Sequence, residues 1–78
     1  MNATGTNITM TPVAGSSLIA ADGWSDDKST LRVRYQNGQE YEFNGLSAAT
    51  YEAYEAAPSK GSYLKRQIEP NIRGIRAS

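Results

Sequence analysis

The sequence predicts a small α+β domain, in which a three-stranded antiparallel meander is packed by two short C-terminal helices. Three apolar runs, at 18–24, 31–35 and 39–43, are separated by turn-forming residues. Two stretches of strong helix formers follow, at 48–57 and 60–68, and a proline ends each of them. The pattern also leaves room for an extra N-terminal edge strand.

The chain has 78 residues, enough for one domain near the lower size at which a core holds a fold together without crosslinks. It has no cysteine and no histidine, which excludes disulfides and removes the commonest metal ligand and general base. We therefore expect a protein without enzymatic activity, metal or cofactor. Residues 1–10 lack the features of a signal peptide, and no apolar run is long enough for a membrane span. We expect a cytoplasmic protein.

Charge is unevenly distributed along the chain. Eight basic and eight acidic residues give a formal net charge of zero, but five of the bases lie in residues 58–78. Such a basic end indicates an anionic partner. We divide the chain into an N-terminal arm (1–12), a domain (13–72) and a basic C-terminal tail (73–78).

The first predicted strand, 18–24, runs into a polar turn. Asp22, Asp26 and Asp27 lie around this turn and offer oxygens to a hard cation. Their spacing lacks the regular alternation and the distal glutamate of a calcium loop. We therefore expect a solvated turn and predict no metal site.

The hairpin between the second and third strands has a predictable register. A two-residue loop at Asn37-Gly38 would set Val33 opposite Glu42 and place charges among apolar side chains. A three-residue loop with Gly38 in the left-handed conformation keeps the two faces separate. The pairs of this register are Val33 with Tyr41, Leu31 with Phe43, Arg34 with Glu40, and Arg32 with Glu42.

The two helices have clear start and stop signals. Ser47 and Ser59 are predicted N-caps, and Pro58 and Pro70 end the helices. Helical periodicity predicts which positions lie on the sheet. These are Leu46, Thr50, Ala53, Tyr54 and Ala57 for the first helix, and Leu64 and Ile68 for the second.

Several short motifs occur in a specific order. They are Leu31-Arg32-Val33, Asn37-Gly38, Tyr41-Glu42-Phe43, Tyr51 and Ala57-Pro58-Ser59-Lys60-Gly61-Ser62-Tyr63. Over residues 13–72 this arrangement resembles the KTSC domain, a small module named after the C-terminal extension of some lysyl-tRNA synthetases. Phe43 departs from the pattern, which has a second tyrosine there. The resemblance implies a compact domain of bacterial and phage proteins, with RNA binding suggested by the link to a synthetase.

The aromatic residues of the family motif have two interpretations. They are Tyr41, Phe43, Tyr51 and Tyr63. Tyr41 and Phe43 alternate along one strand, as do the stacking aromatics of sheets that bind single-stranded RNA. Their face also carries Leu31 and Val33 and has to be covered to make a core, so we predict core packing.

Arg32 and Arg34 lie on the opposite face of the hairpin and have the spacing of a basic stripe. The predicted register sets Glu42 and Glu40 across from them. We therefore predict cross-strand ion pairs rather than a free basic surface.

The start of the second helix is the best candidate site. Its backbone amides and helix dipole favour an anion, and Gly61 permits close approach. The candidate anion- or nucleic-acid-binding residues are Ser59, Lys60, Gly61, Ser62, Lys65, Arg66, Arg73 and Arg76. In the alternative, Ser59 only caps the helix and Gly61 only relieves crowding against the sheet.

Two functions follow from these observations. The first is a non-catalytic binding module whose partner is RNA, contacted by the helix start and the basic tail. The second is a protein-interaction or structural role, such as a small phage virion component packed against other subunits. Zero net charge weighs against strong non-specific binding of nucleic acid.

Overall fold

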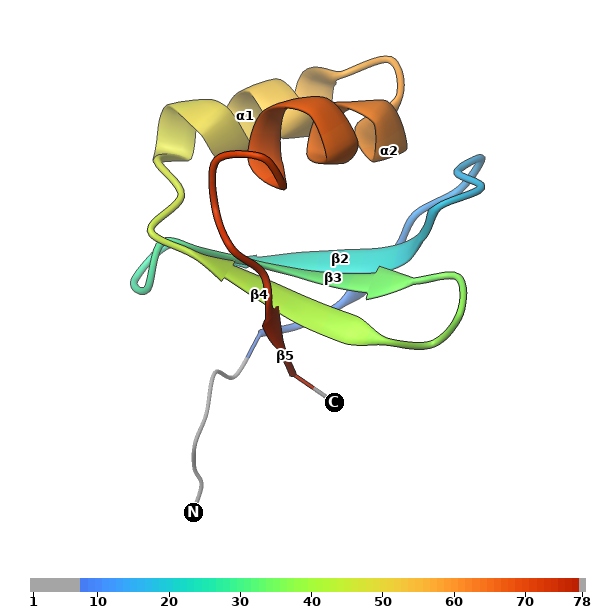
Figure 1. Ribbon diagram of the computed structural model, residues 1–78, viewed down its shortest axis with the longest axis horizontal. Coiled ribbons are helices and arrows are strands. Elements are labelled where there is room, and N and C mark those ends of the chain that lie inside the picture. Colours follow the sequence, from blue (N-terminus) through green and yellow to red (C-terminus); the bar gives the residue numbers. More distant parts are fainter. Residues whose placement is uncertain (1–7, 78) are drawn as a thin grey trace.

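The computed structural model describes residues 8–77, which form one antiparallel sheet with helices on one of its faces (Figure 1). The strand order is β1-β2-β3-β4-β5. The strands are β1 (Thr11–Pro12), β2 (Ile19–Ser25), β3 (Thr30–Tyr35), β4 (Glu40–Asn44) and β5 (Ile75–Arg76). The helices are α1 (Ala48–Ala56) and α2 (Lys60–Tyr63), and α2 continues into a π-helical segment, η1 (Leu64–Ile68). The predicted α+β class is confirmed.

The predicted meander, β2 to β4, is the centre of a sheet that is wider than expected. β1 pairs with β2, so the end of the arm 1–12 supplies an edge strand. β5 pairs with Tyr41 and Glu42 of β4, so part of the tail 73–78 joins the other edge. Residues 1–7 of the arm and residue 78 of the tail lie outside the described residues.

The predicted hairpin register is confirmed at all four pairs, including Leu31 opposite Phe43. Gly38 has a φ of 90° and donates its N–H to the carbonyl of Tyr35 at 2.9 Å. The N–H of Tyr35 donates in turn to the carbonyl of Gln39 at 2.8 Å, which closes the three-residue loop. A left-handed residue at this point favours glycine, so the turn and the side-chain pattern specify the same register.

Both helix starts are capped as predicted. The Ser47 hydroxyl accepts from the N–H of Thr50, and the Ser59 hydroxyl accepts from the N–H of Ser62. Leu46, just before α1, and Tyr54 in α1 are buried, but Ala53 is exposed, so the prediction that Ala53 lies on the sheet was wrong. The sheet-facing stripe is turned towards Tyr51, which stacks on Trp24 with ring centroids 4.4 Å apart.

The second helix differs in detail from the uniform α-helix predicted at 60–68. The N–H of Glu69 donates to the carbonyl of Leu64 at 2.8 Å, a five-residue step that widens the last turn into a π-helix. Leu64 and Ile68 are both fully buried, as predicted. The widened turn leaves Lys65 and Glu69 on the side that borders the β3–β4 end of the sheet, where both line one cleft.

The core lies between the helices and the sheet. Its buried members are Ile19, Leu31, Val33, Phe43, Leu46, Tyr54, Leu64 and Ile68. On the opposite face the chain segment at Ile8 and Thr9 crosses β2 at Gly23, where a Cβ would collide with both residues. Gly23 therefore lets the N-terminal segment lie directly on the sheet.

Candidate functional site

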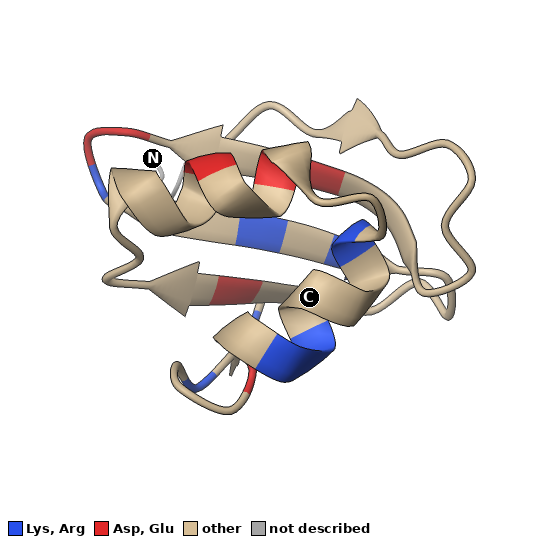
Figure 2. Cartoon of the chain, turned by 90° about the horizontal axis from the view of Figure 1, so that it is seen from above, with Lys and Arg blue, Asp and Glu red and all other residues tan. Residues whose placement is uncertain are grey.

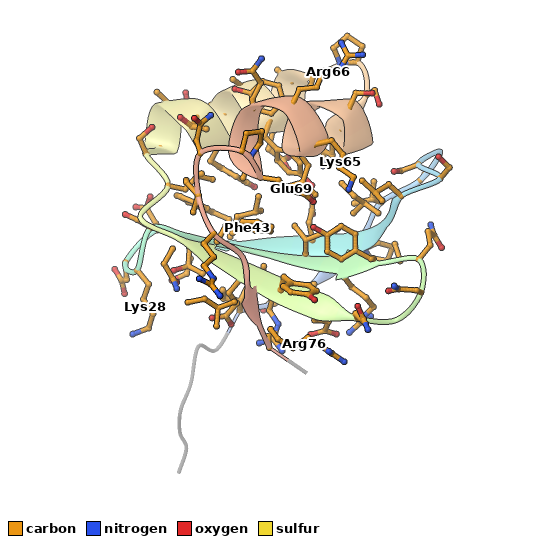
Figure 3. The ribbon with its side chains drawn as sticks, viewed as in Figure 1. Lys28, Phe43, Lys65, Arg66, Glu69 and Arg76 are labelled. Carbon is orange, nitrogen blue, oxygen red and sulfur yellow. The ribbon has the colours of Figure 1, made fainter. Side chains whose placement is uncertain are left out.

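The basic residues predicted to form one anion-binding surface divide into two groups: Lys60, Lys65 and Arg66 line one groove, and Arg73 and Arg76 lie outside it. Figure 3 places Arg66 above the helices, away from the sheet, and Arg76 below the sheet. Lys65 lies between η1 and the sheet, and Arg73 follows in the connection to β5. Within the helical layer, α1 carries acidic residues and α2–η1 carries basic ones (Figure 2). The fold therefore brings together the six predicted site residues from 59 to 66, which line one groove at the start of α2, but not Arg73 and Arg76.

Lys60 takes part in a partly buried network of ion pairs and hydrogen bonds. Its Nζ donates to Asp22 Oδ2 at 3.1 Å and to Glu55 Oε2 at 2.9 Å. The hydroxyl of the fully buried Tyr54 donates to the same Asp22 oxygen at 2.8 Å. The charge of Lys60 is thus neutralised by two carboxylates, and the network joins β2, α1 and α2.

The expectation that Asp22 lies in a solvated turn is wrong, because it is only 6% exposed and lies beneath the helices. Asp26 and Asp27 do remain exposed in the turn. Burial and the hydrogen bond to Asp22 raise the pKa of Tyr54, so its phenol stays protonated and donates. Burial alone would lower the pKa of Lys60, but the hydrogen bonds to Glu55 and Asp22 outweigh burial and raise it.

The start of α2 packs closely on the segment before β2. A Cβ on Gly61 would lie 3.2 Å from the Cβ of Leu18 and 3.6 Å from the Ser16 hydroxyl. Ser59 caps the helix, and its hydroxyl also contacts that of Ser62 at 3.2 Å. These contacts agree with the capping and close-packing alternative for Ser59 and Gly61. A groove of about 680 Å³ remains here, and its lining includes Ser59, Lys60, Gly61, Ser62, Lys65 and Arg66.

A second cleft, of about 600 Å³, lies between the β3–β4 end of the sheet, η1 and the connection to β5. The rings of Tyr35 and Tyr41 meet edge to face in its wall, with centroids 5.7 Å apart and planes at 77°. The Tyr35 hydroxyl donates to Glu69 Oε2 at 2.8 Å. Gly74 also lines the cleft and packs closely on its aromatic residues, since a Cβ there would lie 2.9 Å from the Phe43 ring and 3.4 Å from that of Tyr41.

The charges around this cleft are partly balanced. Lys65 Nζ lies 3.3 Å from Glu69 Oε1, and the Lys65 side chain is 59% exposed. Arg73 lines the cleft, is exposed, and makes no ion pair with any residue of the range 8–77. Burial and the hydrogen bond to Glu69 raise the pKa of Tyr35, so its hydroxyl remains a donor. The cleft thus combines aromatic walls, one partly exposed carboxylate and two basic side chains.

Sequence reasoning missed Tyr35 and Glu69 as site residues. Tyr35 continues the alternation of Leu31 and Val33 along β3, so its position on the helix-facing side was predictable. Glu69 is four residues after Lys65, a spacing that favours an ion pair on a helix. Their direct contact joins residues far apart in the chain and had no local signal.

The opposite face of the sheet carries the ion pairs predicted from the hairpin register. Arg32 contacts Glu40 at 2.7 Å and Glu42 at 3.3 Å, and Arg34 contacts Glu40 at 2.6 Å. The hydrogen bond from Arg34 lowers the pKa of Glu40, burial opposes this, and the bond from Arg32 adds to the lowering. This face is therefore an ion-paired network and not a free basic stripe.

Within residues 8–77, no cluster of acidic side chains has the make-up of a metal site. No helix in that part of the chain is long and apolar enough to cross a membrane.

Comparison with known proteins identifies the family. A family model for the KTSC domain matches residues 15–71, more than half of the chain. The chain belongs to the KTSC domain family. The crystal structure of the KTSC domain protein YPO2434 from Yersinia pestis matches with a TM-score of 0.83 and 21% identity, over 91% of this chain and 99% of that chain. This likeness shows a shared fold. A search of curated proteins gives no match.

The KTSC match also locates the cleft within the family domain. Tyr35, Tyr41, Lys65 and Glu69 lie inside the matched range, and Arg73 lies just beyond it. Both edge strands, β1 and β5, also lie outside that range. The cleft is therefore built mainly from the KTSC domain and is completed by the segment that follows it.

Proposed function

We propose that this KTSC domain is a non-catalytic binding module for single-stranded RNA, and that the RNA lies across the cleft at Tyr35 and Tyr41. The observation that carries the proposal is the combination of these aromatic rings with the exposed side chains of Lys65 and Arg73. Aromatic side chains stack on unpaired bases, and neighbouring basic side chains hold the phosphates. The proposed site keeps Lys65 and Arg73 of the predicted set and leaves out Lys60.

The expected binding is weak and depends only modestly on salt. The net charge is zero, and the cleft has two basic side chains, Lys65, which is paired with Glu69, and Arg73, which makes no ion pair within residues 8–77. Each phosphate contact on a single strand adds about 0.7 to the magnitude of the slope of the logarithm of the binding constant against the logarithm of the salt concentration. Two contacts therefore give a slope magnitude of about 1.4. Base stacking, worth about 1–3 kcal/mol per base, supplies most of the affinity.

Fluorescence anisotropy with labelled RNA oligonucleotides at low and moderate salt tests the proposal. Arg73→Gln should weaken binding to all sequences and reduce the salt slope by about 0.7. Lys28→Gln is the matched control, because Lys28 is an exposed base in the β2–β3 turn, far from the cleft (Figure 3). Absence of binding at low salt, or an equal effect of the two variants, would contradict the proposal.

A second candidate function is interaction with another protein, such as a neighbouring subunit of a virion. It is favoured by Ile75, which is 56% exposed on the two-residue strand β5 at the sheet edge. An open sheet edge can pair with a strand of another protein through main-chain hydrogen bonds, and apolar side chains on that edge add specificity. Two results together would support this function. The wild-type chain should capture a protein from the native host or virion, and Ile75→Asp should not capture it. The chain should also bind no RNA. The first function is proposed to act in the cytoplasm and the second in the virion.

A further inference from the structure

The carboxylate of Glu69 retains hydrogen-bonding capacity towards the cleft. Its Oε2 accepts from the Tyr35 hydroxyl at 2.8 Å, and its Oε1 lies 3.3 Å from Lys65 Nζ. An ionised carboxylate has about four acceptor positions, so each oxygen has about one left. The Glu69 side chain is 28% exposed and points from the residue after η1 towards the sheet (Figure 3). Glu69 therefore offers two adjacent acceptors to a ligand in the cleft.

Two adjacent acceptors select a ligand edge with two adjacent donors. Among the RNA bases, guanine alone has such an edge, formed by its N1–H and its 2-amino group. Adenine and cytosine place a ring acceptor beside their amino group, and uracil flanks its one N–H with carbonyls, so each would bring an acceptor against the carboxylate. A guanidinium group also has paired donors, but its positive charge would be repelled by Lys65 and Arg73.

The surroundings of Glu69 suit a flat base. The Tyr35 and Tyr41 rings form the apolar wall of the cleft, and the Tyr35 hydroxyl fixes the carboxylate through its hydrogen bond. A base whose edge reaches Glu69 would lie against these rings, with its phosphates towards the exposed Arg73. Tyr35 thereby acts as a positioning residue for Glu69.

We infer that the cleft recognises guanine through the Glu69 carboxylate. This inference rests on the proposed RNA-binding function and adds a base preference to it. A good paired contact between a side chain and a base discriminates against the wrong base by about tenfold. Replacing one uridine by guanosine in a short oligouridine should therefore raise the affinity by about that factor.

The experiment compares oligouridines of one length in which the central base is uracil, guanine, adenine, cytosine or hypoxanthine. The guanine oligonucleotide should bind about tenfold more tightly than those with uracil, adenine or cytosine, and hypoxanthine, which lacks the 2-amino group, should fall between guanine and uracil. Glu69→Gln replaces one acceptor by a donor and should remove the guanine preference in favour of adenine, the base that amide side chains pair with. Glu52→Gln, an exposed change on α1 with the same loss of charge, should retain it.

The outcomes separate the base preference from the proposed function. Equal affinity for all five oligonucleotides would overturn guanine recognition and leave RNA binding intact. A guanine preference that survives Glu69→Gln would also overturn the assignment to Glu69. Absence of binding by every oligonucleotide at low salt would overturn both. The hypoxanthine comparison uses the unmodified protein, so it stands even if Glu69→Gln does not fold.

Discussion

Asp22→Ala tests the buried network that holds the helices on the sheet. Asp22 is 6% exposed and accepts from the hydroxyl of Tyr54, which is fully buried. Its removal leaves that hydroxyl without its acceptor, at a cost of about 1–3 kcal/mol. Lys60 keeps Glu55 as a partner and stays partly exposed, so the lost ion pair adds less than about 1 kcal/mol.

The expected total is about 1–4 kcal/mol, a large share of the roughly 4–12 kcal/mol that stabilises a domain of this size. The melting temperature should fall by about 4–30 °C, since 1 kcal/mol corresponds to about 4–8 °C. Thermal and urea unfolding, followed by circular dichroism and by the fluorescence of Trp24, measures both quantities.

A double-mutant cycle makes this prediction stricter. Tyr54→Phe should cost about 1–2 kcal/mol, because Asp22 keeps Lys60. The double variant Asp22→Ala/Tyr54→Phe should be more stable than Asp22→Ala alone, because no buried hydroxyl is then left unpaired. Additive effects, or a cost for Asp22→Ala below about 0.5 kcal/mol, would refute the buried network and favour a solvated Asp22.

Three further predictions concern the sheet. Gly38→Ala should lower the free energy of unfolding by about 1 kcal/mol or more, because Gly38 has a φ of 90°; an unchanged urea midpoint would contradict this. Phe43→Ala should cost about 3 kcal/mol, because Phe43 is 2% exposed; loss of RNA binding at an unchanged melting temperature would instead indicate a binding platform. The pKa of Glu40 is lowered from its ordinary 4.5, so its pairs with Arg34 and Arg32 stabilise the fold above that pH and are lost as pH falls through the lowered pKa. The stability difference between the wild type and Glu40→Gln, measured by urea unfolding, should therefore shrink from neutral to acid pH, and a constant difference would show that this linkage is absent.

The parts of the fold that the sequence predicted are those with local signals. Gly38 specifies the hairpin loop, and alternation along β3 and β4 then sets every pair in the register. Ser47 and Ser59 mark the helix starts because a hydroxyl one turn before a free N–H is a strong local cap.

The parts that could not be predicted depend on contacts between distant residues. In the sequence, Asp22 resembles the nearby turn residues Asp26 and Asp27. Its burial depends on Lys60 of α2, which is 38 positions further along the chain. Ala53 has the right helical spacing for burial. The stacking of Tyr51 on Trp24 rotates α1 so that Tyr51, and not Ala53, faces the sheet. The strand β5 has only two residues, and its pairing depends on Gly74 lying against the Phe43 ring.

The same reason explains the partial prediction of the candidate site. Clustering of basic residues in 58–78 drew attention to Lys65 and Arg73, which line the cleft, but the fold places most of the predicted set around the groove at the start of α2 and Arg76 below the sheet. The cleft itself depends on the Tyr35–Glu69 contact, which joins β3 to the residue that follows η1.

The most direct test of RNA binding at the cleft is an NMR titration of the isotope-labelled protein with the guanine-containing oligouridine. Chemical-shift changes should concentrate at Tyr35, Tyr41, Glu69 and Gly74, with the fold otherwise unchanged. Shift changes confined to β5 or to the start of α2, or no changes at millimolar RNA, would contradict RNA binding at the cleft.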